Sequence, residues 1–241
     1  LELLAAKNCP SGLLDVILMP DQMMLQIHES IGHLLELDRI LGDERNFAGT
    51  SFVSLDMFGT YRYGSELLNV TYDPTRAEQF ASYGWDDDGL AAEKQFVIRA
   101  GMLERPLATP SKARSSECRS KGRACRPWSR SPRTRAKVWP ALSSAKGSCG
   151  RRACRWWPRV RSACRLTGMT RFASFWVENG AIKAPLNVMR FDDTAYRVLR
   201  DNLEALTRER DLVVDDNSYG ERSTSSMRTP GALVREFALT L

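Results

Sequence analysis

The spacing of apolar residues predicts one prominent helix near the start of the chain. From Gln22 to about position 41, large apolar side chains recur at intervals that place them on one helical face: Met23, Met24, Ile27, Ile31, Leu34 and Leu35. Asp21 is a suitable N-cap for this helix. The apolar run at 16–19, which Pro20 ends, predicts a strand immediately before it.

Most of the remaining pattern is typical of strands and turns. Runs rich in β-branched, aromatic and other apolar residues predict strands at 50–55, 68–72, 95–98 and 237–241. Two further runs flank Asn179-Gly180, a dipeptide that favours tight turns between antiparallel strands. We therefore expect a hairpin over 175–182.

A second helix is predicted near 193–209. The sequence Asp192-Asp193-Thr194 supplies capping residues. Apolar residues follow at helical spacing: Tyr196, Val198, Leu199, Leu203 and Leu206. The fold class expected from all these elements is α+β: a mostly antiparallel β-sheet domain with one main helix near its N-terminus and this further helix.

Charge and composition divide the chain into three parts. Residues 103–168 contain 18 of the 35 Lys+Arg residues and only two acidic residues, so this stretch has a net charge of +16 and the rest has −10. The stretch also holds five of the six cysteines and four of the six tryptophans, without a sustained helical or strand period. We therefore expect 1–102 and 169–241 to form one domain that 103–168 interrupts.

Three interpretations of the basic stretch remain open. Its Lys and Arg side chains could neutralise nucleic-acid phosphates while its Trp rings stack on bases. It could be a disordered arginine-rich segment. It could also be an out-of-frame translation of a GC-rich gene, which yields Arg, Ala, Ser, Pro, Cys and Trp. We favour the last interpretation, because the change in composition is abrupt at both edges.

The composition excludes several classes of protein. No apolar run reaches the length of about eighteen residues that a membrane helix needs. The cysteines are not spread through the chain as a disulfide framework, which argues against a small secreted protein. The start, Leu1-Glu2-Leu3-Leu4, has neither an initiator methionine nor a basic signal region, so we expect the chain to be part of a longer protein.

Both histidines of the chain lie in the first predicted helix, His28 and His33, and Glu29 directly follows the first of them. Two imidazoles can bind zinc, and a carboxylate can activate a metal-bound water. The pattern H-E-x-x-x-H is one residue longer than that of the common zinc proteases. Residues five apart lie about 140° apart around a regular helix, so one ion can reach both rings only if the helix is irregular. We expect a π-bulge at Gly32.

Other polar groups favour less specific roles. The two histidines could be incidental residues of an amphipathic helix. The run Asp86-Asp87-Asp88 lacks the alternating ligand spacing of a calcium loop and predicts a solvated turn. The serines at 223–226 have no remaining histidine to activate them, which argues against a serine hydrolase.

Four segments resemble the TldD/PmbA family of metalloproteases, also known as the modulator of DNA gyrase family. They are HESIGHLLELDRILGDERNFAGTSFV at 28–53, SYGWDDDGLAAE at 82–93, FWVENGAIKAPLNVMRFDD at 175–193 and YGERSTSSMRTPGALV at 219–234. The resemblance covers 1–102 and 169–241. It implies a mostly β C-terminal domain that follows an N-terminal domain, and cytoplasmic proteolysis of small or partly unfolded peptides, often by a pair of sister subunits.

The resemblance also implies roles for individual residues. His28 and His33 match the family's metal-binding histidines, and Glu29 matches the general base. Many members supply a third ligand from a C-terminal cysteine that precedes glycine and a basic residue. Tyr219-Gly220-Glu221 occupies that place here, which makes Tyr219 the candidate third-ligand position.

A zinc-dependent peptidase is therefore the leading hypothesis, although imidazole ligands also suit iron, copper and nickel. An inactive or frameshift-damaged member of the family is the first alternative. A nucleic-acid-binding module that uses 103–168 is the second. No membrane association is expected.

Overall fold

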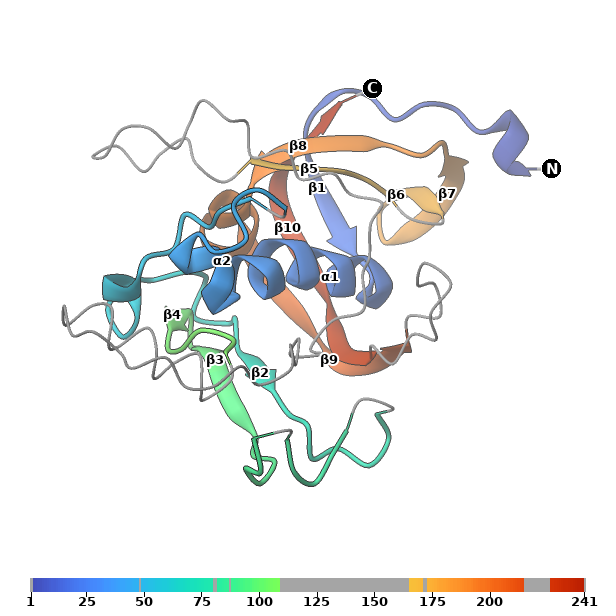
Figure 1. Cartoon of the computed structure of the whole chain (residues 1–241). Coiled ribbons are helices and arrows are strands. Elements are labelled where there is room, and N and C mark those ends of the chain that lie inside the picture. Colours follow the sequence, from blue (N-terminus) through green and yellow to red (C-terminus); the bar gives the residue numbers. More distant parts are fainter. Residues whose placement is uncertain are drawn as a thin grey trace.

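The computed structural model describes a set of antiparallel sheets around one irregular helix (Figure 1). The described residues are 2–47, 49–79, 82–86, 88–108, 165–170, 173–214 and 226–240. The expected α+β class is confirmed, since strands dominate and the main helical segment lies near the N-terminus. Among the described residues, no helix combines the length and apolar character needed to cross a bilayer.

The largest sheet is built around the long C-terminal strand β10 (Ser226–Thr240). All its pairings are antiparallel, and β10 pairs with three strands: β1 (Gly12–Leu18), β8 (Arg190–Thr194) and β9 (Leu203–Val214). Strand β5 (Arg165–Met169) extends the sheet beyond β8. The predicted strand at 16–19 is confirmed over 16–18 as the end of β1, and the closing strand at 237–241 is confirmed over 237–240 as the end of β10.

Two smaller sheets complete the β structure. One contains β2 (Val70–Tyr72), β3 (Gln95–Arg99) and β4 (Met102–Leu103). The other is the hairpin of β6 (Ser174–Glu178) and β7 (Ala181–Leu186). Asn179 and Gly180 both have positive φ, at 51° and 75°, as the tight turn between the two strands requires. The predicted hairpin is therefore confirmed.

The predicted helix at 22–41 is present as four consecutive pieces. Helix α1 (Pro20–Ile27) leads into a π-helical turn (His28–Gly32), hereafter the π turn, and then into a 3₁₀ turn (His33–Leu35). Extended backbone at Glu36 separates these from α2 (Leu37–Leu41). The N-cap prediction is wrong: Met19 is the N-cap and Pro20 the first helical residue, because proline fits the position where no hydrogen-bond donor is needed.

The core joins this helical segment to both larger sheets. Met23, Ile31 and Leu35 are almost fully buried and belong to one apolar cluster with residues of β3, β4 and β10. The members from these strands are Val97, Ile98, Leu103, Ala232, Val234, Phe237 and Leu239. The helix is thus held from two sides, and its irregular portion lies against rigid strands.

Two further sequence-based predictions are wrong. The helix expected near 193–209 is limited to a short helical stretch that ends in a π-helical turn (Arg197–Asp201), and β9 follows from Leu203. Residues of β9 pair with β10, a partner too distant in sequence for the local pattern to reveal. The strand expected at 50–55 is irregular backbone that enters a 3₁₀ turn (Leu55–Met57). A further 3₁₀ turn occupies Glu2–Ala5.

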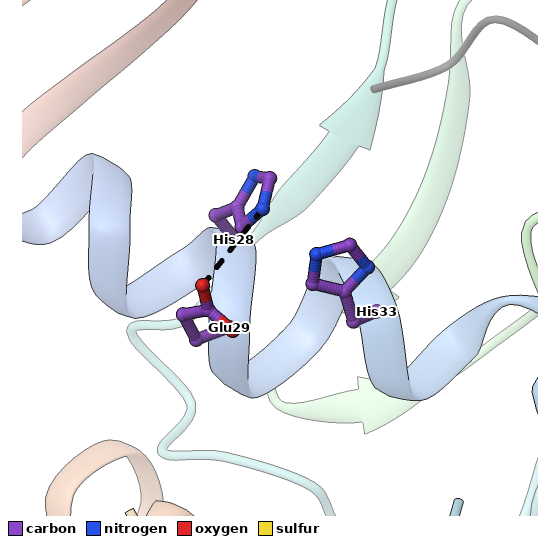
Figure 2. A group of neighbouring side chains, drawn as sticks. All are labelled: His28, Glu29 and His33. Carbon is purple, nitrogen blue, oxygen red and sulfur yellow. Dashed lines mark ion pairs between the residues drawn. The ribbon is translucent and has the colours of Figure 1, made fainter. Parts of the chain in front are cut away.

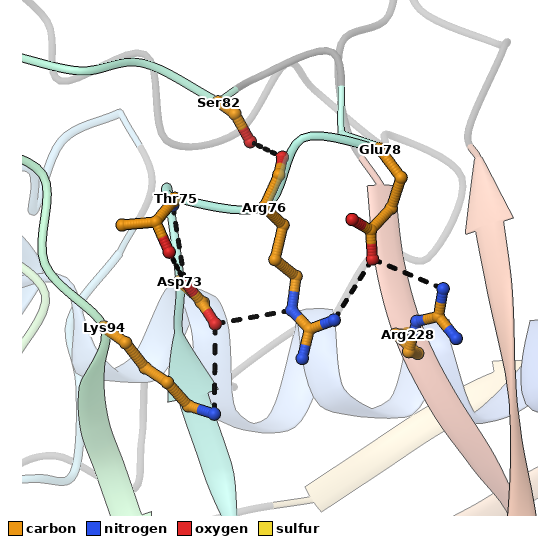
Figure 3. A network of polar contacts seen from close by, with 7 residues as sticks. All are labelled: Asp73, Thr75, Arg76, Glu78, Ser82, Lys94 and Arg228. Carbon is orange, nitrogen blue, oxygen red and sulfur yellow. Dashed lines mark hydrogen bonds and ion pairs between the residues drawn. The ribbon is translucent and has the colours of Figure 1, made fainter.

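A polar network ties the loop after β2 to the main sheet (Figure 3). Asp73 lies 3.4 Å from the Arg76 guanidinium and 3.9 Å from the Lys94 ammonium. Arg76 also contacts Glu78 at 3.1 Å, and Glu78 contacts Arg228 of β10 at 3.3 Å. Most of these groups are partly exposed, so each pair contributes about 1 kcal/mol or less.

Candidate metal centre

The π turn is the feature that brings the two histidines together. The backbone N–H of His33 donates a hydrogen bond to the carbonyl of His28, five residues earlier. One extra residue in the turn offsets the rotation that would separate these positions on a regular α-helix. Figure 2 shows both rings and the Glu29 side chain along one helical segment. The irregularity expected next to Gly32 is therefore confirmed.

The three side chains form a compact group. The ring centroids of His28 and His33 are 4.4 Å apart, with ring planes at 87°. Nε2 of His28 lies 4.0 Å from Oε1 of Glu29 (Figure 2), too far for a hydrogen bond. One ligand atom from each of the three residues lies within 4.8 Å of the others. Among the described residues, this is the one group of three His, Cys, Asp or Glu side chains with such spacing.

Burial sets the electrostatics of the group. His28 is only 1% exposed, whereas the side chains of Glu29 and His33 are 17% and 23% exposed. Burial, aided by the nearby His33 and Arg39, lowers the pKa of His28 to about 3, so its ring is neutral at physiological pH. Burial also raises the pKa of Glu29 above its ordinary value. A neutral imidazole and a carboxyl that readily accepts a proton suit metal binding and base catalysis.

Groups distant in sequence satisfy the backbone of the irregular segment. The Tyr63 hydroxyl donates a hydrogen bond to the carbonyl of Ser30, inside the π turn. The Ser51 hydroxyl donates to the carbonyl of Leu34 at 2.6 Å. A backbone donor, the Leu107 N–H, reaches the carbonyl of Leu35 at 2.8 Å. Because buried carbonyls must be paired, these contacts stabilise a helix that departs from regular geometry.

Glu36 orients the second histidine. Its Oε1 lies 3.0 Å from Nδ1 of His33, and its Oε2 lies 3.5 Å from Nε of Arg39. An ionised carboxylate only accepts hydrogen bonds, so Nδ1 carries the hydrogen and Nε2 keeps its lone pair. Sequence reasoning missed Glu36, although its i,i+3 spacing from His33 is a detectable signal.

The donor set fits a transition metal. Two imidazoles, that of the almost fully buried His28 and that of His33, match ligands that zinc and related divalent metals take in proteins, and the neighbouring Glu29 carboxylate can act as a base on a metal-bound water. The predicted third-ligand position, Tyr219, lies outside the described residues.

The carboxylate of Asp86 accepts hydrogen bonds from the N–H groups of Asp88 and Leu90, as expected for a turn.

Comparison with known proteins identifies relatives of this chain. The model of the PmbA/TldA metallopeptidase C-terminal domain matches residues 11–143. A metalloprotease of Methanocaldococcus jannaschii is 38% identical over 107 residues, which are 44% of this chain and 22% of that protein. A metalloprotease TldD homolog of Buchnera aphidicola subsp. Acyrthosiphon pisum is 32% identical over 119 residues, 49% of this chain and 23% of the relative. The match thus spans about a fifth of each curated relative.

Solved structures share the fold. A Bacteroides thetaiotaomicron protein named as a modulator of DNA gyrase superposes with a TM-score of 0.59 at 15% identity, over 99% of this chain and 49% of that one. TldE of Thermococcus kodakarensis superposes with a TM-score of 0.57 at 13% identity, over 97% of this chain and 51% of that one. The family model covers more than half of the chain, which shows that the chain belongs to the TldD/PmbA family and carries its metallopeptidase C-terminal domain.

Proposed function

We propose that this chain hydrolyses peptide bonds with a divalent metal ion, most simply zinc, held by His28 and His33. One observation carries the proposal: the π turn brings together two imidazoles that a regular helix would separate, beside the Glu29 carboxylate. When bound, zinc supplies acidification of a water molecule and polarisation of the peptide carbonyl. The curated relatives named metalloproteases support the same reaction class.

In this proposal Glu29 moves the proton. Its carboxylate takes a proton from the attacking water and delivers it to the amine that leaves when the peptide bond breaks. Burial raises the pKa of Glu29, which brings its proton affinity closer to that of a base working near neutral pH. The partial exposure of Glu29 and His33 leaves both side chains in contact with solvent.

The wider setting is part of the proposal. We expect the substrate to be a small peptide or a partly unfolded protein, and the compartment to be the cytoplasm. A relative named a TldD homolog and a structural neighbour named TldE support a sister subunit as partner. Tyr219 is proposed as the third-ligand position.

The test is substitution of Glu29 by Gln in zinc-loaded protein. We expect Glu29→Gln to retain stoichiometric zinc but to cleave a peptide library at least about 100-fold more slowly, because the base is lost while the histidines remain. Glu66→Gln, at a glutamate that is 80% exposed, is the matched control and should cleave normally. Unchanged cleavage by Glu29→Gln, or wild-type protein without zinc, would contradict the proposal.

The alternatives predict different outcomes. An inactive or frameshift-damaged chain would cleave no peptide, and a shifted reading frame across codons 103–168 would then encode ordinary β-rich sequence. A nucleic-acid-binding module based on the net charge of +16 in 103–168 predicts binding that weakens steeply with salt.

A further inference from the structure

The geometry points to a support for His33 that lies outside the metal-ligand set. We propose that Tyr63 and Glu36 are positioning residues: Tyr63 holds the π turn in shape, and Glu36 fixes the tautomer of His33 so that Nε2 faces the site. This inference rests on the proposed metal site and adds the residues that prepare the second histidine for it.

Tyr63 acts on the backbone of the π turn. In a regular α-helix, the Ser30 carbonyl would accept a hydrogen bond from the N–H four residues later. Tyr63 is only 2% exposed, and its hydroxyl donates to this carbonyl from outside the helix. The hydroxyl therefore gives this carbonyl a donor that does not depend on regular helical geometry. Without it, tightening of the turn would satisfy the carbonyl and rotate His33 away from His28.

The position of Tyr63 is itself fixed. The backbone N–H groups of Tyr63 and Gly64 donate to the carbonyl of Gly101 at 2.8 and 3.1 Å. The Tyr63 ring packs near Phe52 and Tyr61, with centroids 5.9 and 6.3 Å away. A tyrosine held by a β-turn and by two aromatic neighbours is a rigid donor, which a positioning role requires.

Glu36 acts on the imidazole ring of His33. Its carboxylate is 3.0 Å from Nδ1 of His33, and Arg39 contacts its second oxygen, which holds the carboxylate in place. A metal-binding histidine commonly donates its other ring N–H to a carboxylate, and loss of such a partner lowers metal affinity by about 10- to 100-fold. Free neutral histidine prefers the Nε2–H tautomer. The Glu36 carboxylate should therefore shift His33 to the Nδ1–H tautomer even when no metal is bound.

The first experiment reads the tautomer in metal-free protein. Because the chain has only two histidines, ¹⁵N-histidine labelling gives two sets of imidazole signals. The set that disappears in His28→Gln belongs to His28, and the remaining set belongs to His33. At about pH 8, where ordinary imidazoles are neutral, we expect His33 in the Nδ1–H form. Glu36→Ala should shift it toward Nε2–H, and Glu66→Ala should not. An Nε2–H form of His33 in the wild type would overturn the role of Glu36.

The second experiment measures metal binding by chelator competition and by the visible spectrum of the cobalt-loaded chain. Glu36→Ala and Tyr63→Phe should each weaken zinc binding about 10- to 100-fold and change the cobalt spectrum. Tyr72→Phe is the control, since the Tyr72 hydroxyl pairs with Tyr83. Wild-type affinity and spectrum in both variants would overturn the proposal while leaving the peptidase proposal intact. Wild-type protein without zinc affinity would refute the peptidase proposal, and the tautomer would still decide the role of Glu36.

Discussion

Gly101 should be far less tolerant of a side chain than Gly180, although their backbones are alike. Each follows a residue with positive φ in a turn between two strands, and their own φ values are 78° and 75°. A Cβ at Gly180 would meet nothing within 4 Å. A Cβ at Gly101 would lie 2.2 Å from the Gly64 carbonyl oxygen and 2.6 Å from that of Ser65. The two substitutions therefore separate backbone strain from steric overlap.

The expected magnitudes follow from these contacts. Alanine in the left-handed region costs about 1–2 kcal/mol, and this cost applies to both Gly101→Ala and Gly180→Ala. At Gly101 the obstructing atoms belong to the backbone of Gly64 and Ser65, so the two chain segments must move apart. This movement strains the two hydrogen bonds that the N–H groups of Tyr63 and Gly64 donate to the Gly101 carbonyl. Losing two such bonds costs about 1–3 kcal/mol more. We therefore expect Gly101→Ala to destabilise the fold by about 1–3 kcal/mol more than Gly180→Ala.

The assay is urea unfolding monitored by tryptophan fluorescence and circular dichroism. The midpoint should fall much further for Gly101→Ala than for Gly180→Ala, with slopes equal to that of the wild type. Equal losses in the two variants would refute the steric argument. A Gly101→Ala variant as stable as the wild type would show that Tyr63 is not held by this turn.

The other predictions concern the site helix. Burial lowers the pKa of His28 to about 3, below the value of about 6.5 for an unfolded histidine. As the pH falls, the unfolded chain therefore binds a proton before the folded chain does. The stability that the neutral ring contributes is complete above about pH 6.5 and is lost as the pH falls toward 3. His28→Gln should flatten the loss of urea stability between about pH 7 and about pH 5. The raised pKa of Glu29 acts in the opposite direction, so Glu29→Gln should steepen that loss. Leu35→Ala, at a fully buried side chain, should lower the unfolding free energy by about 2–5 kcal/mol in the same assay. Ser51→Ala should cost about 1–3 kcal/mol by leaving the Leu34 carbonyl without its hydroxyl donor, and a thermal melt unchanged from wild type would contradict this.

Local signals explain which elements could be predicted from the sequence. Asn179-Gly180 determines its hairpin through the positive φ of two adjacent residues, which needs no tertiary information. The irregular helix was predictable because the five-residue spacing of His28 and His33 conflicts with regular α geometry. In contrast, Leu203 and the residues after it follow a helical pattern but form β9, because β10 offers backbone partners along their length.

The supports of the site could not be predicted in the same way. Tyr63, Ser51 and Leu107 reach the site helix from 17 to 72 residues away, and nothing in their local sequence marks them as donors to its carbonyls. Glu36 differs, since its spacing from His33 was visible, but a charged side chain at i,i+3 on a helix is common. Only the contact of Glu36 with Nδ1 of His33 marks it as a residue that orients this histidine.

X-ray absorption at the zinc edge of the zinc-loaded chain tests the central claim most directly. The account predicts two imidazole nitrogens about 2.0–2.1 Å from zinc in the wild type, and one in His33→Gln. Two imidazoles would mean that the π turn brings His28 and His33 to the same ion. A zinc ion with one imidazole or none in the wild type would contradict the account.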